Sequence, residues 1–191
     1  MARFLLAAAF LCASFAHAQD FDVKIWEGVK MPGTVCVDKN SPKISYDEAK
    51  KILGKNPNIS SGKYGQGNEG CQRVVEPTLR CFKAVSDSKK PMPAIIICPG
   101  GGYSHLAMGH EGNDIAKFLA ENGTTCFVLA YRIPGNNRES ALMDVQRAIR
   151  LVRKNAKKWN VDPSKIGVMG FSAGGHLSAN ASTNYGREVY A

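Results

Sequence analysis

Short apolar runs alternate with longer amphipathic segments between residues 74 and 191, and this alternation restricts the fold more than any other feature of the sequence. Residues 94–98 form a continuous apolar run ended by a proline and three glycines, which is typical of a strand buried on both faces. Further strands are predicted over 78–84, 125–131 and 166–169, with a turn at 162–164. Helices are predicted over 112–121 and 140–159, and from about residue 173. Such alternation predicts an α/β fold with a mostly parallel sheet, helices on both faces and three layers.

The segment Gly170-Phe171-Ser172-Ala173-Gly174 has the Gly-x-Ser-x-Gly spacing, and it follows a predicted strand and opens a predicted helix. In that context the motif marks a nucleophile on a sharp turn. Side chains at Gly170 and Gly174 would clash in such a turn. The helix N-terminus favours negative charge developing beside the serine. We therefore predict Ser172 as the catalytic nucleophile, with a plain glycine-rich turn as the alternative interpretation.

A second glycine-rich segment, Gly100-Gly101-Gly102, also follows a predicted strand. Chemistry in parallel sheets lies beyond the carboxyl ends of strands. The N–H groups of Gly101, Gly102 and Ala173 are predicted to form an oxyanion hole, in which one donor contributes about 3 kcal/mol. A phosphate loop is the alternative, but the Gly-Lys-Ser/Thr ending and the Gly-x-Gly-x-x-Gly pattern are both missing.

The residues after the glycine run are expected to shape the rim of the pocket: Tyr103, His105 and His110. Each histidine could instead satisfy a buried polar group or serve as a base. No cysteine spacing matches a zinc site, so no metal is predicted, and no cofactor is implied.

Taken together, these motifs resemble the carbohydrate-esterase branch of the α/β-hydrolase superfamily, which includes acetylxylan-esterase-like and feruloyl-esterase-like enzymes. The matching segments are 97–105, 110–112, 144–150 and 167–176, and the resemblance covers residues 74–191. It implies a serine carboxylic ester hydrolase that deacylates plant polysaccharide, either acetylated or feruloylated xylan. The expected partner is an acylated carbohydrate substrate. No carboxylate pair can be singled out for glycosidic cleavage.

The sequence departs from this family after Ser172, where the triad acid and histidine should follow. No aspartate follows the serine, Glu188 is the only later carboxylate side chain, and His176 is the only later histidine. His176 lies one helical turn past the serine and is expected to face the surroundings of the helix. Because a serine without a base is a poor nucleophile, we expect a C-terminally truncated enzyme that is inactive as it stands. Residues 74–191 would then be the N-terminal part of an α/β-hydrolase domain.

Two other functions remain open at this point. A serine peptidase of the prolyl-oligopeptidase type shares the same turn, but residues 19–73 are too few for the second large domain that it needs. A degenerate, non-catalytic hydrolase-like domain that binds carbohydrate would explain the missing acid and histidine.

Residues 1–18 predict a secretory signal peptide, with a basic start at Arg3, an apolar stretch and the small-x-small end Ala16-His17-Ala18. The stretch is shorter than the roughly 20 apolar residues that span a bilayer, so we expect no membrane partner. The protein would be secreted or periplasmic. A buried N-terminal helix is the alternative.

Residues 19–73 are polar, and we interpret them as an N-terminal extension wrapped on the main domain. A short helix is predicted over 45–53, because Ser45 can cap it and Glu48 follows three positions on. Export permits a disulfide, and we expect Cys36 to pair with Cys71.

The formal net charge is +9, and basic residues are densest between Arg147 and Lys158. Spaced along a predicted amphipathic helix, they are interpreted as its solvated face. No aromatic residues interleave with them, so no nucleic-acid partner is expected. The oligomeric state stays open.

Overall fold

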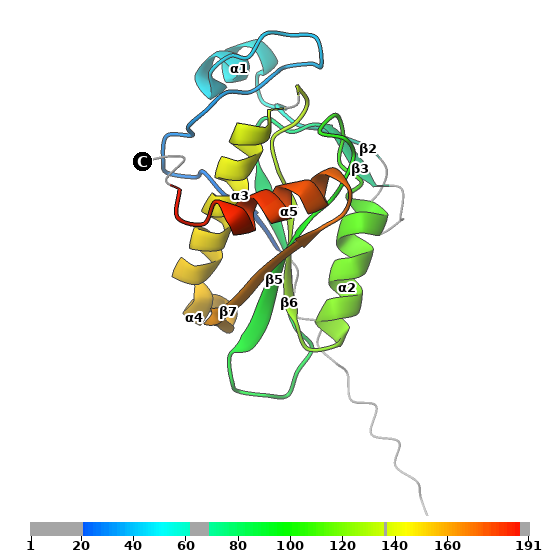
Figure 1. Cartoon of the computed structure of the whole chain (residues 1–191), viewed down its shortest axis with the longest axis vertical. Helices are drawn as coiled ribbons and strands as arrows, with labels where there is room; N and C mark the ends of the chain where they lie inside the picture. The colour runs from blue at the N-terminus through cyan, green and yellow to red at the C-terminus, as the bar shows by residue number, and fades with distance from the viewer. Residues whose placement is uncertain (1–20, 62–68, 136, 188–191) are drawn as a thin grey trace, which may run out of the picture.

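The computed structural model describes residues 21–61, 69–135 and 137–187, so the predicted signal peptide lies outside the described residues. Within these ranges the main sheet has five strands in the order β1-β4-β6-β5-β7 (Figure 1). They are β1 (Phe21–Lys24), β4 (Thr78–Phe82), β5 (Met92–Cys98), β6 (Thr125–Ala130) and β7 (Val161–Gly170). Strand β5 is parallel to β6 and β7, whereas β4 is antiparallel to both β1 and β6. Four strands therefore share one direction, and the predicted mostly parallel α/β sheet is confirmed.

Helices cover both faces of this sheet (Figure 1). One side carries α2, and the other carries α3, α4 and α5, with α5 packed on β7 and β5 and beside α3. The helices are α1 (Tyr46–Leu53), the π-helix η1 (Gly109–Asn113), α2 (Asp114–Glu121), α3 (Arg138–Lys154), α4 (Ala156–Trp159) and α5 (Ala173–Thr183). The sequence predicted one helix over 140–159, but the structure breaks it at Asn155. The side-chain amide of Asn155 donates to the carbonyl of Leu151, which ends α3.

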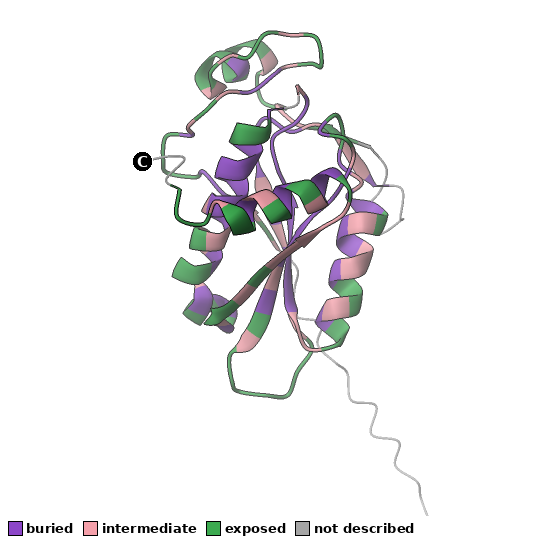
Figure 2. Cartoon of the chain, in the orientation of Figure 1, coloured by how far each residue is buried: buried purple, intermediate pink, exposed green. Residues whose placement is uncertain are grey.

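The core lies between the sheet and these helices, where buried residues line the inner faces (Figure 2). Strand β6 is buried along its whole length because it lies between two neighbouring strands and is covered by helices. Strand β5 is also largely buried, as its continuous apolar run predicted.

Strand β7 is longer than the sequence predicted, because the predicted turn at 162–164 lies inside it as a bulge. Val161 pairs with Met92 and Ile166 pairs with Ala94, so the residues between them have no place in the register. The Asp162 carboxylate accepts hydrogen bonds from the N–H of Ser164 at 2.9 Å and from its hydroxyl at 2.6 Å. This is the side-chain-to-backbone bonding of an aspartate turn.

The N-terminal segment contributes more regular structure than its composition suggested. The helix predicted over 45–53 is confirmed as α1, with the Ser45–Glu48 capping box present. Strand β1, which the sequence analysis missed, pairs with β4 at the edge of the main sheet. Strands β2 (Ile59–Ser61) and β3 (Gly70–Arg73) form a separate antiparallel pair.

The predicted disulfide between Cys36 and Cys71 is wrong, because both thiols are free. Cys36 is buried, and its side chain lies directly against the backbone of Gly135. Cys71 lies in β3, where its sulfur is 3.6 Å from the hydroxyl of Ser60. Each thiol is therefore packed into its own surroundings.

Candidate active site

Strands β5 and β7 are parallel neighbours, and their last residues, Cys98 and Gly170, pair with each other. The glycine run follows Cys98, and the serine turn follows Gly170. Both loops therefore leave the sheet side by side at the same edge. A Cβ built on Gly100 would lie 3.1 Å from the Cβ of Ser172, so the two loops are in contact.

Ser172 has φ 48° and ψ −115°, a left-handed conformation that a residue with a side chain rarely adopts. Strain of this kind costs roughly 1–3 kcal/mol and persists only where the surroundings impose it. A Cβ at Gly170 would overlap the carbonyl oxygen of Gly174, and one at Gly174 would overlap that of Cys98. The glycine spacing is therefore a steric requirement of a turn that leaves the Ser172 side chain exposed.

The glycine run forms a compact turn after β5. The N–H groups of Ser104 and His105 both donate to the carbonyl of Gly101, at 3.0 and 3.1 Å. Gly101 and Gly102 have φ values of 130° and 61°, which favour glycine. Among the described residues, none accepts a hydrogen bond from the N–H of Gly101, Gly102 or Ala173. These amides are thus available for an external acceptor.

The peptide unit between Pro99 and Gly100 is hydrogen-bonded through both its carbonyl and its N–H. The Tyr131 hydroxyl donates to the carbonyl of Pro99 at 2.7 Å, and the N–H of Gly100 donates to the Glu111 carboxylate at 2.7 Å. Neither Glu111 nor Tyr131 was predicted as a site residue. Tyr131 directly follows a strand next to β5, at the edge where site residues gather, and that position is the signal that could have identified it.

The predicted rim residues occupy different environments. Tyr103 is buried, and its hydroxyl is 2.8 Å from Nδ1 of His176. Burial raises the pKa of Tyr103, so its hydroxyl stays protonated at neutral pH. His105 and His110 are exposed, and Nε2 of His110 lies 4.0 Å from the Glu111 carboxylate.

The side chain of His176 contacts Tyr103, a contact that sequence spacing did not reveal, while its backbone N–H donates to the carbonyl of Ser172 at 3.0 Å. Within the described part of the chain, no histidine is hydrogen-bonded to the Ser172 hydroxyl. The described residues therefore offer an exposed serine hydroxyl and three amides without an acceptor among them, but no histidine bonded to that hydroxyl.

The model of the BD-FAE family matches residues 83–189, more than half of the chain and the whole of the region just described. The chain belongs to the BD-FAE family. Its resemblance to the α/β-hydrolases is thereby confirmed.

The curated relatives of this BD-FAE chain include an esterase and a xylanase. Acetylxylan esterase of Xylanibacter ruminicola is 47% identical over 109 residues, which cover 57% of this chain and 22% of that protein. Endo-1,4-beta-xylanase B of Butyrivibrio fibrisolvens is 34% identical over 115 residues, covering 57% of this chain and 17% of that protein. The chain thus spans about a fifth of the length of these curated relatives.

A solved structure gives the same fold. The acetyl ester-xyloside bifunctional hydrolase from Caldicellulosiruptor lactoaceticus has 47% sequence identity and a TM-score of 0.51, covering 55% of this chain and 37% of that one. The BD-FAE chain therefore corresponds to part of an α/β-hydrolase fold.

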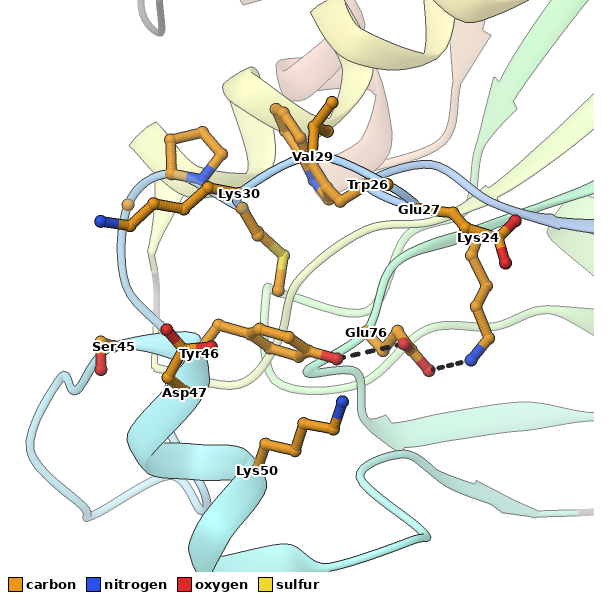
Figure 3. Close-up of a pocket in the computed structure, with 14 residues that line it drawn as sticks. Lys24, Trp26, Glu27, Val29, Lys30, Ser45, Tyr46, Asp47, Lys50 and Glu76 are labelled. Carbon is orange, nitrogen blue, oxygen red and sulfur yellow. Dashed lines mark hydrogen bonds and ion pairs between the residues drawn. The ribbon is translucent and has the colours of Figure 1, made fainter.

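A hollow of about 410 Å³ lies apart from the serine, between the turn after β1 and the start of α1 (Figure 3). The Glu76 carboxylate joins its walls, 3.0 Å from the Lys24 amine and 3.1 Å from the Tyr46 hydroxyl. The Lys50 amine lies 5.8 Å from the centre of the Tyr46 ring. Since these groups bond to one another, we interpret the hollow as part of the contact between α1 and the rest of this BD-FAE protein.

Metal-binding clusters and membrane-spanning helices are both absent from the described residues. Across residues 21–61, 69–135 and 137–187, no group of three or more His, Cys, Asp or Glu side chains is placed to hold a metal ion. The helices in these ranges are all too short or too polar to cross a membrane.

Proposed function

We propose that this BD-FAE protein is a secreted serine carboxylic ester hydrolase that deacylates plant polysaccharide, with acetylated or feruloylated xylan as the substrate class. The observation that supports it most is the exposed, left-handed Ser172 on a turn that contacts the glycine run at Gly100. The amides of Gly101, Gly102 and Ala173 have no acceptor among the described residues. This geometry suits the attack of a hydroxyl on an ester carbonyl.

In the proposed reaction, the Ser172 hydroxyl oxygen bonds to the ester carbonyl carbon while its proton passes to a base. The carbonyl oxygen becomes an oxyanion held by the three amides. The carbon–oxygen bond to the sugar then breaks, and the sugar leaves as an alcohol with that proton. Water hydrolyses the acyl-enzyme, which releases the acid and restores the serine.

The base and the acid that orients it are proposed to come from a part of the complete protein other than residues 21–187. Histidine is the expected base, because its pKa near neutrality suits proton transfer. The names of the relatives support the choice of xylan. Residues 1–18 support secretion, which would bring the enzyme to a polymer outside the cell.

The first prediction tests the nucleophile. Ser172→Ala in the complete protein should lower the rate of acetate release from acetylated xylan by roughly 10⁴-fold or more, because the substitution removes the oxygen that forms the acyl-enzyme. Ser182→Ala is the matched control, since Ser182 is an exposed serine on the same helix. An unchanged rate in Ser172→Ala would reject the assignment.

The same assay separates the alternatives. A peptidase would cleave dipeptide amides faster than it releases acetate. A carbohydrate-binding protein would bind acetylated xylan, as measured by calorimetry, without releasing acid. Either result would replace the esterase proposal.

A further inference from the structure

The peptide unit between Pro99 and Gly100 is held from both sides. Its carbonyl accepts from the Tyr131 hydroxyl, and its N–H donates to the Glu111 carboxylate, each at 2.7 Å. Because a peptide unit is planar and its C=O and N–H point in opposite directions, these two bonds fix the rotation of the whole plane. The chain enters Gly101 and Gly102 from this plane.

The anchors themselves have little freedom. Tyr131 is fully buried. Burial also raises its pKa well above the usual range, so the hydroxyl remains a donor at any working pH. Glu111 lies in η1, and a Cβ at Gly112 would lie only 2.8 Å from a methyl group of Val128. The π-helix is therefore pressed against β6, which fixes the position of Glu111.

Gly100 lies between the Glu111 carboxylate and the serine. A Cβ built on Gly100 would be 2.6 Å from Oε2 of Glu111 and 3.1 Å from the Cβ of Ser172. The successive glycines have almost no torsional preference of their own. The peptides that follow have bonds of their own, since the carbonyl of Gly100 accepts from the N–H of Ala107 at 3.1 Å and the carbonyl of Gly101 accepts from Ser104 and His105. The two bonds to the Pro99–Gly100 peptide fix the plane from which this turn starts.

We propose that Glu111 and Tyr131 are positioning residues, which clamp the Pro99–Gly100 peptide and thereby aim the N–H groups of Gly101 and Gly102 at the oxyanion. The inference rests on the proposed ester hydrolysis. Glu111 acts through its acceptor oxygen and not through its charge, since a negative charge close to the oxyanion would itself be unfavourable. Preorganised donors act because they need no reorientation during the reaction.

The experiment compares two substitutions of similar length in the complete protein. Glu111→Met removes the acceptor, whereas Glu111→Gln removes only the charge and keeps an amide oxygen. Tyr131→Phe removes the other bond without changing the shape of the buried ring. Glu121→Met is the matched control, because Glu121 is exposed at the end of the neighbouring helix α2.

We expect Glu111→Met to lower kcat for p-nitrophenyl acetate by about 100-fold, the loss typical of one oxyanion donor, with KM changed less than about twofold. Inhibition by phenylboronic acid, whose serine adduct mimics the tetrahedral oxyanion, should weaken in proportion. Glu111→Gln should keep at least about ten times the kcat of Glu111→Met, and Tyr131→Phe should lose about tenfold. A kcat of wild-type size in Glu111→Met, or equal losses in the Met and Gln variants, overturns the clamp.

A readout that does not depend on catalysis separates this inference from the proposed function. The amide NMR resonances of Gly101 and Gly102 should shift in Glu111→Met and Tyr131→Phe, and much less in Glu111→Gln and Glu121→Met. Unshifted resonances overturn the clamp. Activity that survives Ser172→Ala while these resonances still shift rejects Ser172 as the nucleophile and leaves the clamp intact. If Glu111→Met fails to fold, kcat and the amide resonances measured in Tyr131→Phe test the clamp instead.

Discussion

At the scale of single residues, the serine turn depends on the absence of a Cβ atom at Gly170 and Gly174. Ser172 keeps its left-handed backbone because β5 and α5 approach each other at the backbone itself. The carbonyl of Cys98 occupies the place where a Gly174 side chain would begin. The position of the hydroxyl is thus set by the close approach of two backbone segments, and not by hydrogen bonds of its own.

This close approach gives the second prediction. Gly174→Ala should destabilise the protein by about 3 kcal/mol, because the new methyl group must displace backbone rather than a flexible side chain. Denaturant unfolding measures the loss. Gly167→Ala is the control, since its Cβ would make only an ordinary 3.9 Å contact with Ile95. Equal stability of the two variants would contradict the steric account.

At the scale of elements, the N-terminal segment is attached to the start of α3 by polar contacts. The Ser140 hydroxyl donates to the carbonyl of Thr34 at 2.9 Å. The indole N–H of Trp26 donates to the buried Asp144 carboxylate, which also pairs with Arg132 at 2.8 Å. Because removing one partner would leave a buried charge unpaired, this network holds the segment to the domain.

The third prediction concerns how α1 is attached. Burial and the Glu76 carboxylate raise the pKa of Tyr46 from 10.0 to about 12. Since the folded state holds this proton more tightly than the unfolded state, the contribution of Tyr46 to stability is present below pH 10 and is lost as the pH rises through about 12.

Stability measured from pH 9 to pH 12 tests this effect. Tyr46→Phe should make the alkaline loss of stability smaller than in the wild type, because the substitution removes one of the groups that titrate. Tyr185→Phe is the control, as Tyr185 is 88% exposed. Identical alkaline profiles for the wild type and Tyr46→Phe would refute the role of this hydroxyl.

At the scale of the whole molecule, β7 forms one edge of the main sheet, since only β5 pairs with it among the described residues. Beside it lies a groove of about 450 Å³ between α3 and α5. Its lining includes Ile149, Ile166 and Val168, and Tyr185 projects from the same wall. An open edge strand next to apolar side chains can pair with another chain.

The fourth prediction follows from this edge. The 191-residue chain should self-associate, and Gly167→Lys should reduce that association, because a lysine on an edge strand opposes pairing with a second strand. Gly167 is exposed and has room for a side chain. Light scattering and size-exclusion chromatography measure the effect. Gly186→Lys adds the same charge away from the sheet, so an equal reduction in both variants would attribute the effect to net charge alone.

Local patterns in the sequence were enough for most elements of the main domain. The apolar run at 94–98, the amphipathic stripe of α3 and the capping box at Ser45 each report an interaction between residues near one another in the chain. The patterns were insufficient for β1, whose four residues form a strand only because they pair with β4. The surroundings of Cys36 and Cys71 also depended on neighbours that lie far away in the sequence, whereas the break at Asn155 comes from a local bond to Leu151 that the helical pattern did not reveal.

The sequence by itself determined the order of strands β4 to β7 along the chain, the position of the serine turn and the glycine run, and hence the resemblance to the family. Only the tertiary structure decided that Glu111 and Tyr131 hold the Pro99–Gly100 peptide, that Tyr103 bonds to His176, and that the Ser172 turn contacts the glycine run. The physical reason is one of range. Propensity and periodicity act over a few residues, whereas a hydrogen bond to a backbone group requires the exact placement that the packed sheet and helices supply.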